Sequence, residues 1–311
     1  MTSLLITGVA GFIGSNLAGR LVADGYRVIG IDNLAYGVLE QVPSGVEFHQ
    51  VDIRDPQSYE RYQGVDVVFH LAAKNCIADC QADPVETFDI NVHGTAHVFE
   101  AARRARVRKV IYAESSAMYE GVAELPSSED QTAPQSFYAL SKEAARLVAQ
   151  GYWAHHQLVS TALRYFCVYG PRQDYRRTIP PVMSAFIIKL LSGERPIIYG
   201  TGSKRRDFVY VDDVNDFHVA CVVDARTDNQ TFNLGGGENY SVRDIYDRIA
   251  ALLQSPLQPR HEPDLPGEAL DTLADITLAR SVGWTPKTDL DAGLRQSIAY
   301  IKERVLVSRE G

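Results

Sequence analysis

Tyr138 and Lys142 stand four residues apart in the sequence. In a helix, this spacing puts the phenol and the ammonium group on one face. A tyrosine with the usual pKa of about 10 is a poor base at neutral pH, but a neighbouring ammonium favours the phenolate and lowers the pKa. Tyr138 could then take a proton from a hydroxyl group while a hydride leaves the same carbon. Taken alone the pair is a weak signal, because Tyr and Lys at this spacing are common on solvated helices.

Ser115 is a third residue that could take part in this chemistry. It follows a predicted strand, in the segment Ala113–Tyr119, and its hydroxyl could hydrogen-bond the reacting oxygen. Without Tyr138 and Lys142, it would be read as an ordinary loop serine.

Three glycines follow the first predicted strand and open a predicted helix, at Gly8, Gly11 and Gly14. The first can make a tight turn, the second lets the backbone approach a pyrophosphate, and the third permits close helix–strand packing. The start of the helix offers free N–H groups and a positive dipole end to phosphates. A turn used only for packing is the alternative, but the strand, the spacing and a downstream acid together favour a dinucleotide site.

Asp32 is that acid, at the end of the second predicted strand. Its position suits a hydrogen bond to a ribose 2′-hydroxyl, and its charge repels a 2′-phosphate, so we expect NAD rather than NADP. The positive nicotinamide ring would add to the effect of Lys142 on Tyr138. Asp52 and Ile53, at the end of the third strand, could flank the adenine, although structural capping explains them nearly as well.

Strand-like and helix-like segments alternate over the first 170 residues. The predicted strands are Ser3–Thr7, Arg27–Asp32, Glu47–Asp52, Val65–His70, Lys109–Ala113 and Val159–Arg164. The predicted helices include Ile13–Ala23, Val85–Arg104 and Tyr138–His155. Strands joined by helical crossovers form a parallel sheet that must be covered on both faces. The sequence therefore predicts an α/β fold with a doubly wound parallel sheet, the Rossmann architecture.

The pattern changes after Gly170. A strand is predicted over Asp207–Val211, a helix from Asp212 to about Ala225, a second strand over Thr231–Leu234, and a helix opened by a capping-box-like segment, Ser241–Asp244. We expect residues 1–170, with about 207–235, to form the NAD-binding domain. Residues of about 171–206 and 236–311 are expected to form a smaller C-terminal substrate-binding lobe.

The composition excludes several other classes of protein. The 311 residues are 45% hydrophobic and 23% charged, with a formal net charge of −8, as expected for a soluble globular protein without general affinity for nucleic acid. No apolar stretch approaches the roughly 20 residues that span a bilayer, and the N-terminus does not resemble a signal peptide. Four cysteines without a framework indicate a reducing compartment, so we expect a cytoplasmic protein. Neither the cysteines nor the eight histidines show the spacing of a metal site.

Over nearly its whole length the chain resembles the extended short-chain dehydrogenase/reductases, and within them the nucleotide-sugar epimerase and dehydratase group typified by UDP-galactose 4-epimerase. The resemblance rests on the following residues: Thr7–Gly14, Asp32-Asn33-Leu34, His70–Ala73, Asn91, Ser115-Ser116, Tyr138–Lys142, Leu163–Pro171 and Arg206–Val214. It implies the fold, a tightly held NAD, a nucleotide-diphosphate sugar as substrate and a homodimer.

The resemblance also implies roles for individual residues. Ser115, Tyr138 and Lys142 would be the catalytic trio, and Asn91 would support the site. Asn91, Tyr138 and Lys142 would also contact the cofactor. Further cofactor contacts would come from these residues: Phe12, Ile13, Asn33, Leu71, Ala72 and Ala73. Arg206 would contact the diphosphate of the nucleotide. Other basic residues could focus charge on that diphosphate, or could be solvated surface charges: Arg172, Arg176, Arg177, Lys204 and Arg205.

Three departures from the family pattern affect the expected reaction. Dehydratases carry an Asp-Glu pair where this chain has Ser116 and Ala117, and decarboxylases keep a Glu at the second of these positions. Ser116 is expected to contact the substrate instead. Cys167 stands where many epimerases have Asn, so a contact to the sugar or the phosphate is altered; a packing role is favoured over a catalytic one. Lys74 could meet an acidic sugar group, although a solvated lysine explains it as well.

We therefore expect an epimerase acting at C4 of a nucleotide-linked sugar through a 4-keto intermediate. UDP-hexoses, UDP-N-acetylhexosamines and UDP-hexuronates remain open as substrates. The alternatives are a 4,6-dehydratase or a keto-sugar reductase and, in a different class, a non-catalytic protein that senses dinucleotide. The presence of Ser115, Tyr138 and Lys142 together argues against a sensor, because a protein that only binds a dinucleotide does not need a tyrosine activated as a base.

Overall fold

The structure is a computed structural model that describes residues 1–177, 179–264 and 270–306. Its centre is a seven-stranded parallel sheet with the strand order β10-β6-β5-β4-β1-β2-β3. The strands are β1 (Ser3–Thr7), β2 (Arg27–Asp32), β3 (Val46–Gln50), β4 (Val67–His70), β5 (Lys109–Ser115), β6 (Val159–Tyr165) and β10 (Thr231–Leu234). The predicted doubly wound sheet is confirmed.

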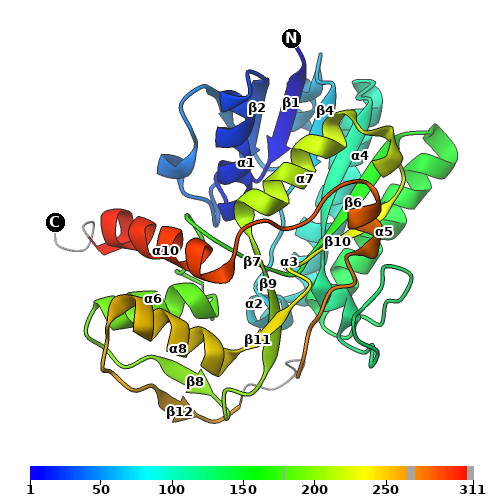
Figure 1. The fold of residues 1–311 in the computed structure, drawn as a ribbon. Helices are drawn as coiled ribbons and strands as arrows, with labels where there is room; N and C mark the ends of the chain where they lie inside the picture. The colour runs from blue at the N-terminus through cyan, green and yellow to red at the C-terminus, as the bar shows by residue number, and fades with distance from the viewer. Residues whose placement is uncertain (178, 265–269, 307–311) are drawn as a thin grey trace.

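Helices cover both faces of this sheet (Figure 1). One face packs against α1 (Phe12–Ala23) and α7 (Val211–Val223), and the other against α4 (Gly94–Arg104) and α5 (Phe137–His156). Successive side chains of β1 enter opposite layers: Leu4 and Ile6 belong to the first core and Leu5 to the second, and none of the three is exposed. This two-sided burial explains why the strand is a continuous apolar run rather than an alternating one.

The helix predicted over Val85–Arg104 is interrupted. Helix α3 (Pro84–Phe88) leads into a π-helical turn, η3 (Asp89–His93), and the chain then continues as α4. A π turn holds one more residue than an α turn, and it directs a side chain that a regular helix would place elsewhere. Here the buried residue of the turn is Asn91.

A smaller lobe lies below the sheet in Figure 1. Its strands are β7 (Cys167–Tyr169), β9 (Arg205–Tyr210) and β11 (Asn239–Ser241) in one sheet, and β8 (Ile197–Tyr199) and β12 (Arg260–Glu262) in another. Its helices are α6 (Val182–Leu191), α8 (Val242–Leu253) and α10 (Leu290–Tyr300), around a separate apolar core. The expected capping box is present, because Ser241 and Asp244 exchange hydrogen bonds at the start of α8.

The strand predicted at residues 207–211 therefore belongs to the small sheet as β9, whereas α7 and β10 return to the large one. The short elements that complete the described chain are α2 (Ile77–Ala82), α9 (Thr277–Ser281), η1 (Leu39–Gln41), η2 (Pro56–Tyr62), η4 (Ser116–Tyr119), η5 (Ala225–Thr227) and η6 (Ile301–Leu306). None of the helices described is both long and apolar enough to cross a membrane.

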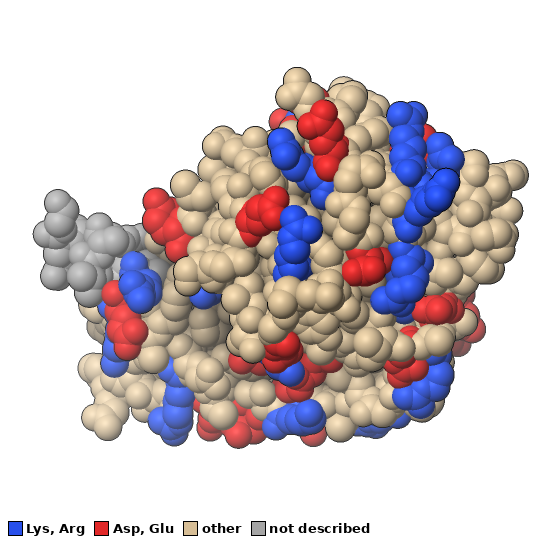
Figure 2. Space-filling view, turned by 90° about the horizontal axis from the view of Figure 1, so that it is seen from above, with Lys and Arg blue, Asp and Glu red and all other residues tan. Residues whose placement is uncertain are grey.

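The face of the molecule in Figure 2 carries basic and acidic side chains interspersed. Elsewhere in the described chain, the half-exposed pairs Arg20–Asp24 and Arg27–Glu47 join side chains of opposite charge at 2.9 and 2.7 Å. Exposed pairs of this kind contribute little to stability, but they neutralise one another. The chain's net negative charge is therefore not accompanied by a single strongly basic area on this face.

Candidate functional site

A cavity of about 2040 Å³ lies at the carboxyl ends of the strands, between the large sheet and the smaller lobe. Residues from α1, from the ends of β2 and β5, from the loop after β4, from α5 and from the segment after β7 line it. The carboxyl edge of a parallel sheet is where doubly wound proteins bind ligands. The cavity is large enough for two nucleotide-sized molecules, since a drug-sized ligand needs about 300–1,000 Å³.

The glycine turn at the start of α1 leaves backbone amides open to the cavity. Gly8 has a φ of +74°, and a Cβ at Gly14 would lie 2.2 Å from the carbonyl oxygen of Gly8, so neither position tolerates a side chain. Gly11 is the N-cap of α1, and no side chain accepts a hydrogen bond from the first turn. Gly11, Phe12 and Ile13 line the cavity. Uncapped amides at a helix N-terminus suit the pyrophosphate of a dinucleotide.

Asp32 occupies the other end of this part of the cavity. Its carboxylate accepts hydrogen bonds from the backbone N–H groups of Ala10 and Leu34, at 3.0 and 2.8 Å. Burial nevertheless raises its pKa. A Cβ at Gly37 would lie 3.0 Å from Asp32 Oδ1, so glycine keeps the carboxylate accessible from that side. The open amides and this fixed acid fit NAD.

Asn33, Asp52 and Ile53 also line the cavity beside Asp32. The Asn33 amide donates to the Asp52 carboxylate at 2.8 Å. The Arg54 guanidinium pairs with the same carboxylate at 2.7 Å and holds the pKa of Asp52 well below its usual range. Asp52 thus helps to fix this wall of the cavity in addition to facing it.

Thr7 fixes the loop that follows β4. Its Oγ1 accepts hydrogen bonds from the N–H groups of Leu71 and Ala72, at 3.1 and 3.2 Å, and contacts His70 Nδ1 at 2.8 Å. Leu71, Ala72 and Ala73, for which cofactor contacts are predicted, line the cavity. The role of Thr7 was missed in the sequence analysis; a threonine directly before the glycine turn was the available signal.

Asn91 is only 2% exposed and lies behind the cavity wall. Its side-chain oxygen accepts from the Lys74 N–H at 2.8 Å, and its amide nitrogen donates to the Lys74 carbonyl and to Ser141 Oγ, each at 2.9 Å. Asn91 therefore joins the loop after Ala73 to helix α5 next to Lys142. This geometry agrees with a supporting role rather than a direct contact.

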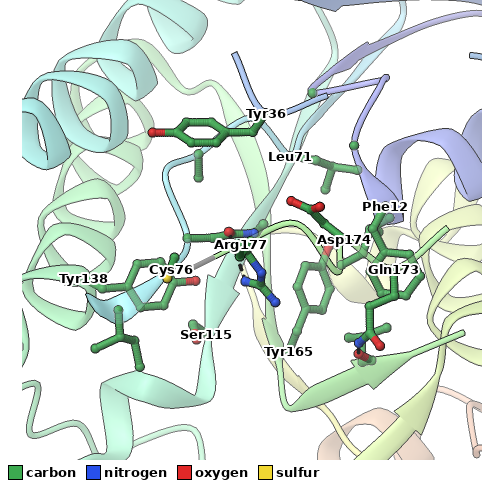
Figure 3. Close-up of a pocket in the computed structure, with 18 of the residues that line it drawn as sticks. Phe12, Tyr36, Leu71, Cys76, Ser115, Tyr138, Tyr165, Gln173, Asp174 and Arg177 are labelled. Atoms are coloured by element: carbon green, nitrogen blue, oxygen red, sulfur yellow. Dashed lines mark hydrogen bonds between the residues drawn. The ribbon is translucent and has the colours of Figure 1, made fainter. Parts of the chain in front are cut away.

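The three candidate catalytic residues converge on the cavity. Tyr138 and Lys142 lie on α5, Ser115 ends β5, and all three line the cavity. Figure 3 shows the side chain of Tyr138 reaching into it, with Ser115 nearby. Lys142 Nζ lies 5.9 Å from the centre of the Tyr138 ring and donates a hydrogen bond to the Ala113 carbonyl at 3.0 Å.

The N-terminus of α5 is held by two residues that the sequence analysis did not single out. Ser136 caps the helix by accepting a hydrogen bond from the Ala139 N–H at 3.1 Å. The Glu120 carboxylate accepts from the Ser136 N–H at 2.7 Å and from its hydroxyl at 2.8 Å. Because Tyr138 lies in the first turn of α5, these contacts set the position of its phenol.

The electrostatics of the pair differ from the expectation. Burial raises the pKa of Tyr138, whereas the Ser115 hydroxyl and the Arg177 charge act in the opposite direction. Burial also lowers the pKa of Lys142 to about 8, partly offset by Glu114. In the protein alone, loss of solvation outweighs the nearby positive charges, so the protein's own groups do not produce the lowering that was predicted for Lys142 and the nicotinamide ring together.

Most of the residues predicted to meet the substrate lie on the cavity wall: Ser116, Cys167, Arg172 and Arg206. Arg172 donates to the Ser15 carbonyl at 2.7 Å, and Arg206 to the carbonyl of its neighbour Arg205 at 2.9 Å. Lys74 is not part of the wall, and its ammonium pairs with Glu86 at 2.5 Å. The structure thus does not support a contact between Lys74 and an acidic sugar group, because the partner of its charge is within the protein.

The remaining basic residues divide into two groups. Arg176 and Arg177 line the cavity, whereas Lys204 and Arg205 do not. Arg205 instead donates to Asn239 at 2.8 Å within the small sheet. Within the described ranges, no three His, Cys, Asp or Glu side chains gather as a metal site would require, and the described cysteines are all free thiols.

The fold and this site define a family. Residues 4–235 match the NAD dependent epimerase/dehydratase family, and the chain belongs to it.

Relatives of known name agree with this membership. A UDP-glucose 4-epimerase of Mycolicibacterium smegmatis is 36% identical over 310 residues, covering 96% of this chain and 98% of the relative. A solved UDP-glucose 4-epimerase of Thermotoga maritima, with UDP-glucose, has a TM-score of 0.94 and 31% identity, covering 98% of this chain and 100% of the other. A UDP-glucuronic acid 4-epimerase of Bacillus cereus, in complex with UDP-glucuronic acid and NAD, has a TM-score of 0.90 and 28% identity over 97% of this chain and 99% of the other.

Proposed function

We propose that the protein is an NAD-dependent epimerase that inverts C4 of a UDP-linked sugar. The observation that carries the proposal is the meeting of Tyr138 and Ser115 in one cavity with the open amides of α1. The relatives named above are 4-epimerases of UDP-sugars, and membership of an NAD-dependent family supplies the cofactor. NAD held by the open amides of α1 and by Asp32 would supply reversible hydride transfer at C4, so the reaction would need no net oxidant.

The residues of the chain would provide the proton transfers. Tyr138 takes the proton of the C4 hydroxyl, and Ser115 hydrogen-bonds the same oxygen. Because burial raises the pKa of Tyr138, deprotonation depends on positive charge close to the phenol. Lys142, fixed by the Ala113 carbonyl, supplies part of that charge. When the 4-keto sugar has turned to present its other face, Tyr138 returns the proton.

The neighbours of Ser115 favour epimerisation over elimination of water. Ser116 and Ala117 line the cavity immediately after it. The Ala117 N–H donates to Ser115 Oγ at 3.2 Å, so this segment orients the serine. Neither side chain can act as the acid and base that a dehydration requires. The carbon skeleton and hydroxyl groups of the sugar are therefore expected to be retained.

We further propose that the large sheet with its helices holds NAD and that the smaller lobe holds the nucleotide sugar. Arg206 on β9 faces the cavity from that lobe and is assigned to the nucleotide diphosphate, with Arg172 beside the α1 end. Ser116 and Cys167 are assigned to the sugar.

A cytoplasmic homodimer is proposed as the working state. Its support is the absence of disulfides among the described cysteines and the exposed apolar side chains on α5, such as Leu147 and Trp153. Sedimentation analysis at several concentrations measures the oligomeric state, and a monomer throughout would contradict this part of the proposal.

The decisive experiment supplies the purified protein and NAD with a panel of UDP-, GDP-, dTDP- and CDP-sugars and follows products by NMR. We expect conversion of a UDP-sugar to its C4 epimer without accumulation of NADH. Tyr138→Phe should abolish turnover while the protein remains folded and binds NAD. Loss of water, net NADH formation or near-normal activity of Tyr138→Phe would contradict the proposal.

A further inference from the structure

Arg177 brings a guanidinium into the cavity with unused hydrogen-bonding capacity. Its Nη1 donates to Asn75 Oδ1 at 3.2 Å. Its Nε is buried and has no hydrogen-bond partner within the described parts of the chain. A guanidinium carries five N–H donors arranged in a planar fork, and a buried donor without an acceptor is costly. The N–H group at Arg177 Nε is therefore available to a hydrogen-bond acceptor on a ligand.

The position of Arg177 relates it to the reacting end of the cavity. Figure 3 shows it between Tyr138 and Tyr165, beside the loop that carries Cys76. Its charge acts on the phenol of Tyr138 and opposes the larger rise in pKa that burial causes. Since Tyr138 faces the C4 hydroxyl in the proposed reaction, Arg177 lies on the side of the sugar's reacting carbon.

Two carboxylates that line the same cavity as Arg177 are already engaged. Asp174 accepts hydrogen bonds from the side chain and backbone of Arg176, at 3.1 and 3.0 Å. Glu120 accepts two hydrogen bonds from Ser136 at the start of α5. In residues 1–177, 179–264 and 270–306, no acidic side chain forms an ion pair with Arg177.

We propose that Arg177 binds a carboxylate on the sugar, so that the substrate class is a UDP-hexuronate. This inference rests on the proposed function. The carboxylate of a hexuronate is attached to C5, the carbon next to C4, and so lies on the side of the reacting carbon where Arg177 is found. Two oxygens of a carboxylate match the guanidinium fork, giving a pair of charge-assisted hydrogen bonds. The single hydroxyl of a neutral hexose would leave the charge unpaired.

The contact between Arg177 and the sugar carboxylate also affects which product the 4-keto sugar gives. With a ketone at C4, the carboxylate on C5 belongs to a β-keto acid, which loses CO₂ when the electrons of the C5–carboxyl bond pass into an enolate at C4 and C5. A guanidinium bound to the carboxylate stabilises its charge before that bond breaks. Arg177 is therefore expected to favour return of the hexuronate epimer over loss of CO₂, which would leave, after protonation of the enolate at C5, a UDP-linked 4-ketopentose.

Kinetics with two substrates test the proposal. We expect kcat/KM for UDP-glucuronate to exceed that for UDP-glucose. Arg177→Gln removes a charge that acts on Tyr138 with either substrate, so the test is the ratio of the two values. The value for UDP-glucuronate should fall by about 30- to 150-fold more than the value for UDP-glucose, as expected for loss of a hydrogen-bonded charge pair. Arg176→Gln is the matched control, because its guanidinium is engaged with Asp174 and the Tyr36 carbonyl. It should change both values by the same factor.

Binding provides a readout that does not depend on turnover. Calorimetry on the NAD-loaded Tyr138→Phe variant should show tighter binding of UDP-glucuronate than of UDP-glucose, and addition of Arg177→Gln should remove the difference. Equal binding, or preferred turnover of UDP-glucose, would overturn the inference and leave the proposed function intact. Failure of every UDP-sugar to bind or react would contradict the proposed function itself, and this inference with it.

Discussion

The side chain of Asn91 holds both backbone polar groups of Lys74, accepting from its N–H at 2.8 Å and donating to its carbonyl at 2.9 Å. The contact resembles the pairing of two strands, but it joins a helix to a loop. It fixes the loop that ends the cofactor side of the cavity and, through Ser141, ties it to the helix that carries Tyr138.

Asn91→Ala should destabilise the protein by about 1–3 kcal/mol, because it leaves buried polar groups of the loop without partners. Urea unfolding measures this change. The turnover number should fall more than the affinity for NAD, since the substitution loosens the position of α5. Asn91→Asp keeps the shape but cannot donate to the Lys74 carbonyl. Unchanged turnover in both variants would show that the clamp is not needed for catalysis.

Lys142→Met should abolish activity and increase the free energy of unfolding at pH 7 by about 1–2 kcal/mol. The reason is that Lys142 is held charged in a buried site, where its pKa is about 8. Because the folded pKa lies below the ordinary value of 10.5, the folded wild type binds fewer protons than the unfolded chain between these pH values.

The wild type should therefore gain stability from this group as the pH rises from 8 to 10.5. The advantage of Lys142→Met should be largest at pH 7 and smaller at pH 9.5, as measured by urea unfolding at both. A stability difference independent of pH would contradict the assignment of the effect to the ammonium.

Asp32→Asn should shift the preference between the two nicotinamide dinucleotides. The buried carboxylate repels a 2′-phosphate, and the amide does not, so the ratio of the NADP and NAD dissociation constants should fall by at least about tenfold. Fluorescence titration measures both constants. Asp24→Asn removes the same charge at the other end of α1 and should leave the ratio unchanged. A ratio unaffected by Asp32→Asn would show that the acid does not select the cofactor.

Arg164→Met should destabilise the protein by about 3–5 kcal/mol. Arg164 and Glu114 form an ion pair at 2.9 Å between β6 and β5, with side-chain exposures of 1% and 0%. Loss of one partner leaves the other charge buried and unpaired. Adding Glu114→Gln should recover part of the loss, and equilibrium unfolding of both variants measures it. A double variant no more stable than the single one would contradict this account.

The sequence predicted the central sheet well because its strands are apolar runs between helical patterns. The bounds of β1 and β2 agree with the predicted ones. Prediction of the site followed from the same topology, since residues after parallel strands meet at one edge of the sheet. The grouping of Ser115 with Tyr138 came instead from the family resemblance, and both residues line the cavity.

Other features depended on contacts between distant segments. The three-residue strands β7 and β8 are too short to show a pattern of their own. The direction of the Tyr138 pKa shift depends on burial by the surrounding chain. The pairing of Lys74 with Glu86, and the inward placement of Arg177, likewise require the folded arrangement.

The π turn at Asp89–His93 has a less favourable geometry than an ordinary α-helical turn, and the side chains that it positions explain why it is present. Removing one residue would restore an ordinary helix, with better internal geometry, but it would rotate the following residues by about 100° relative to those before the turn. The amide of residue 91 and the apolar side chains of α4 could then no longer both face inward. The π turn thus lets one continuous helical stretch place the apolar side chains of α4 in the core and the amide of Asn91 against the loop at Lys74. A variant shortened by one residue would lose one of these two contacts.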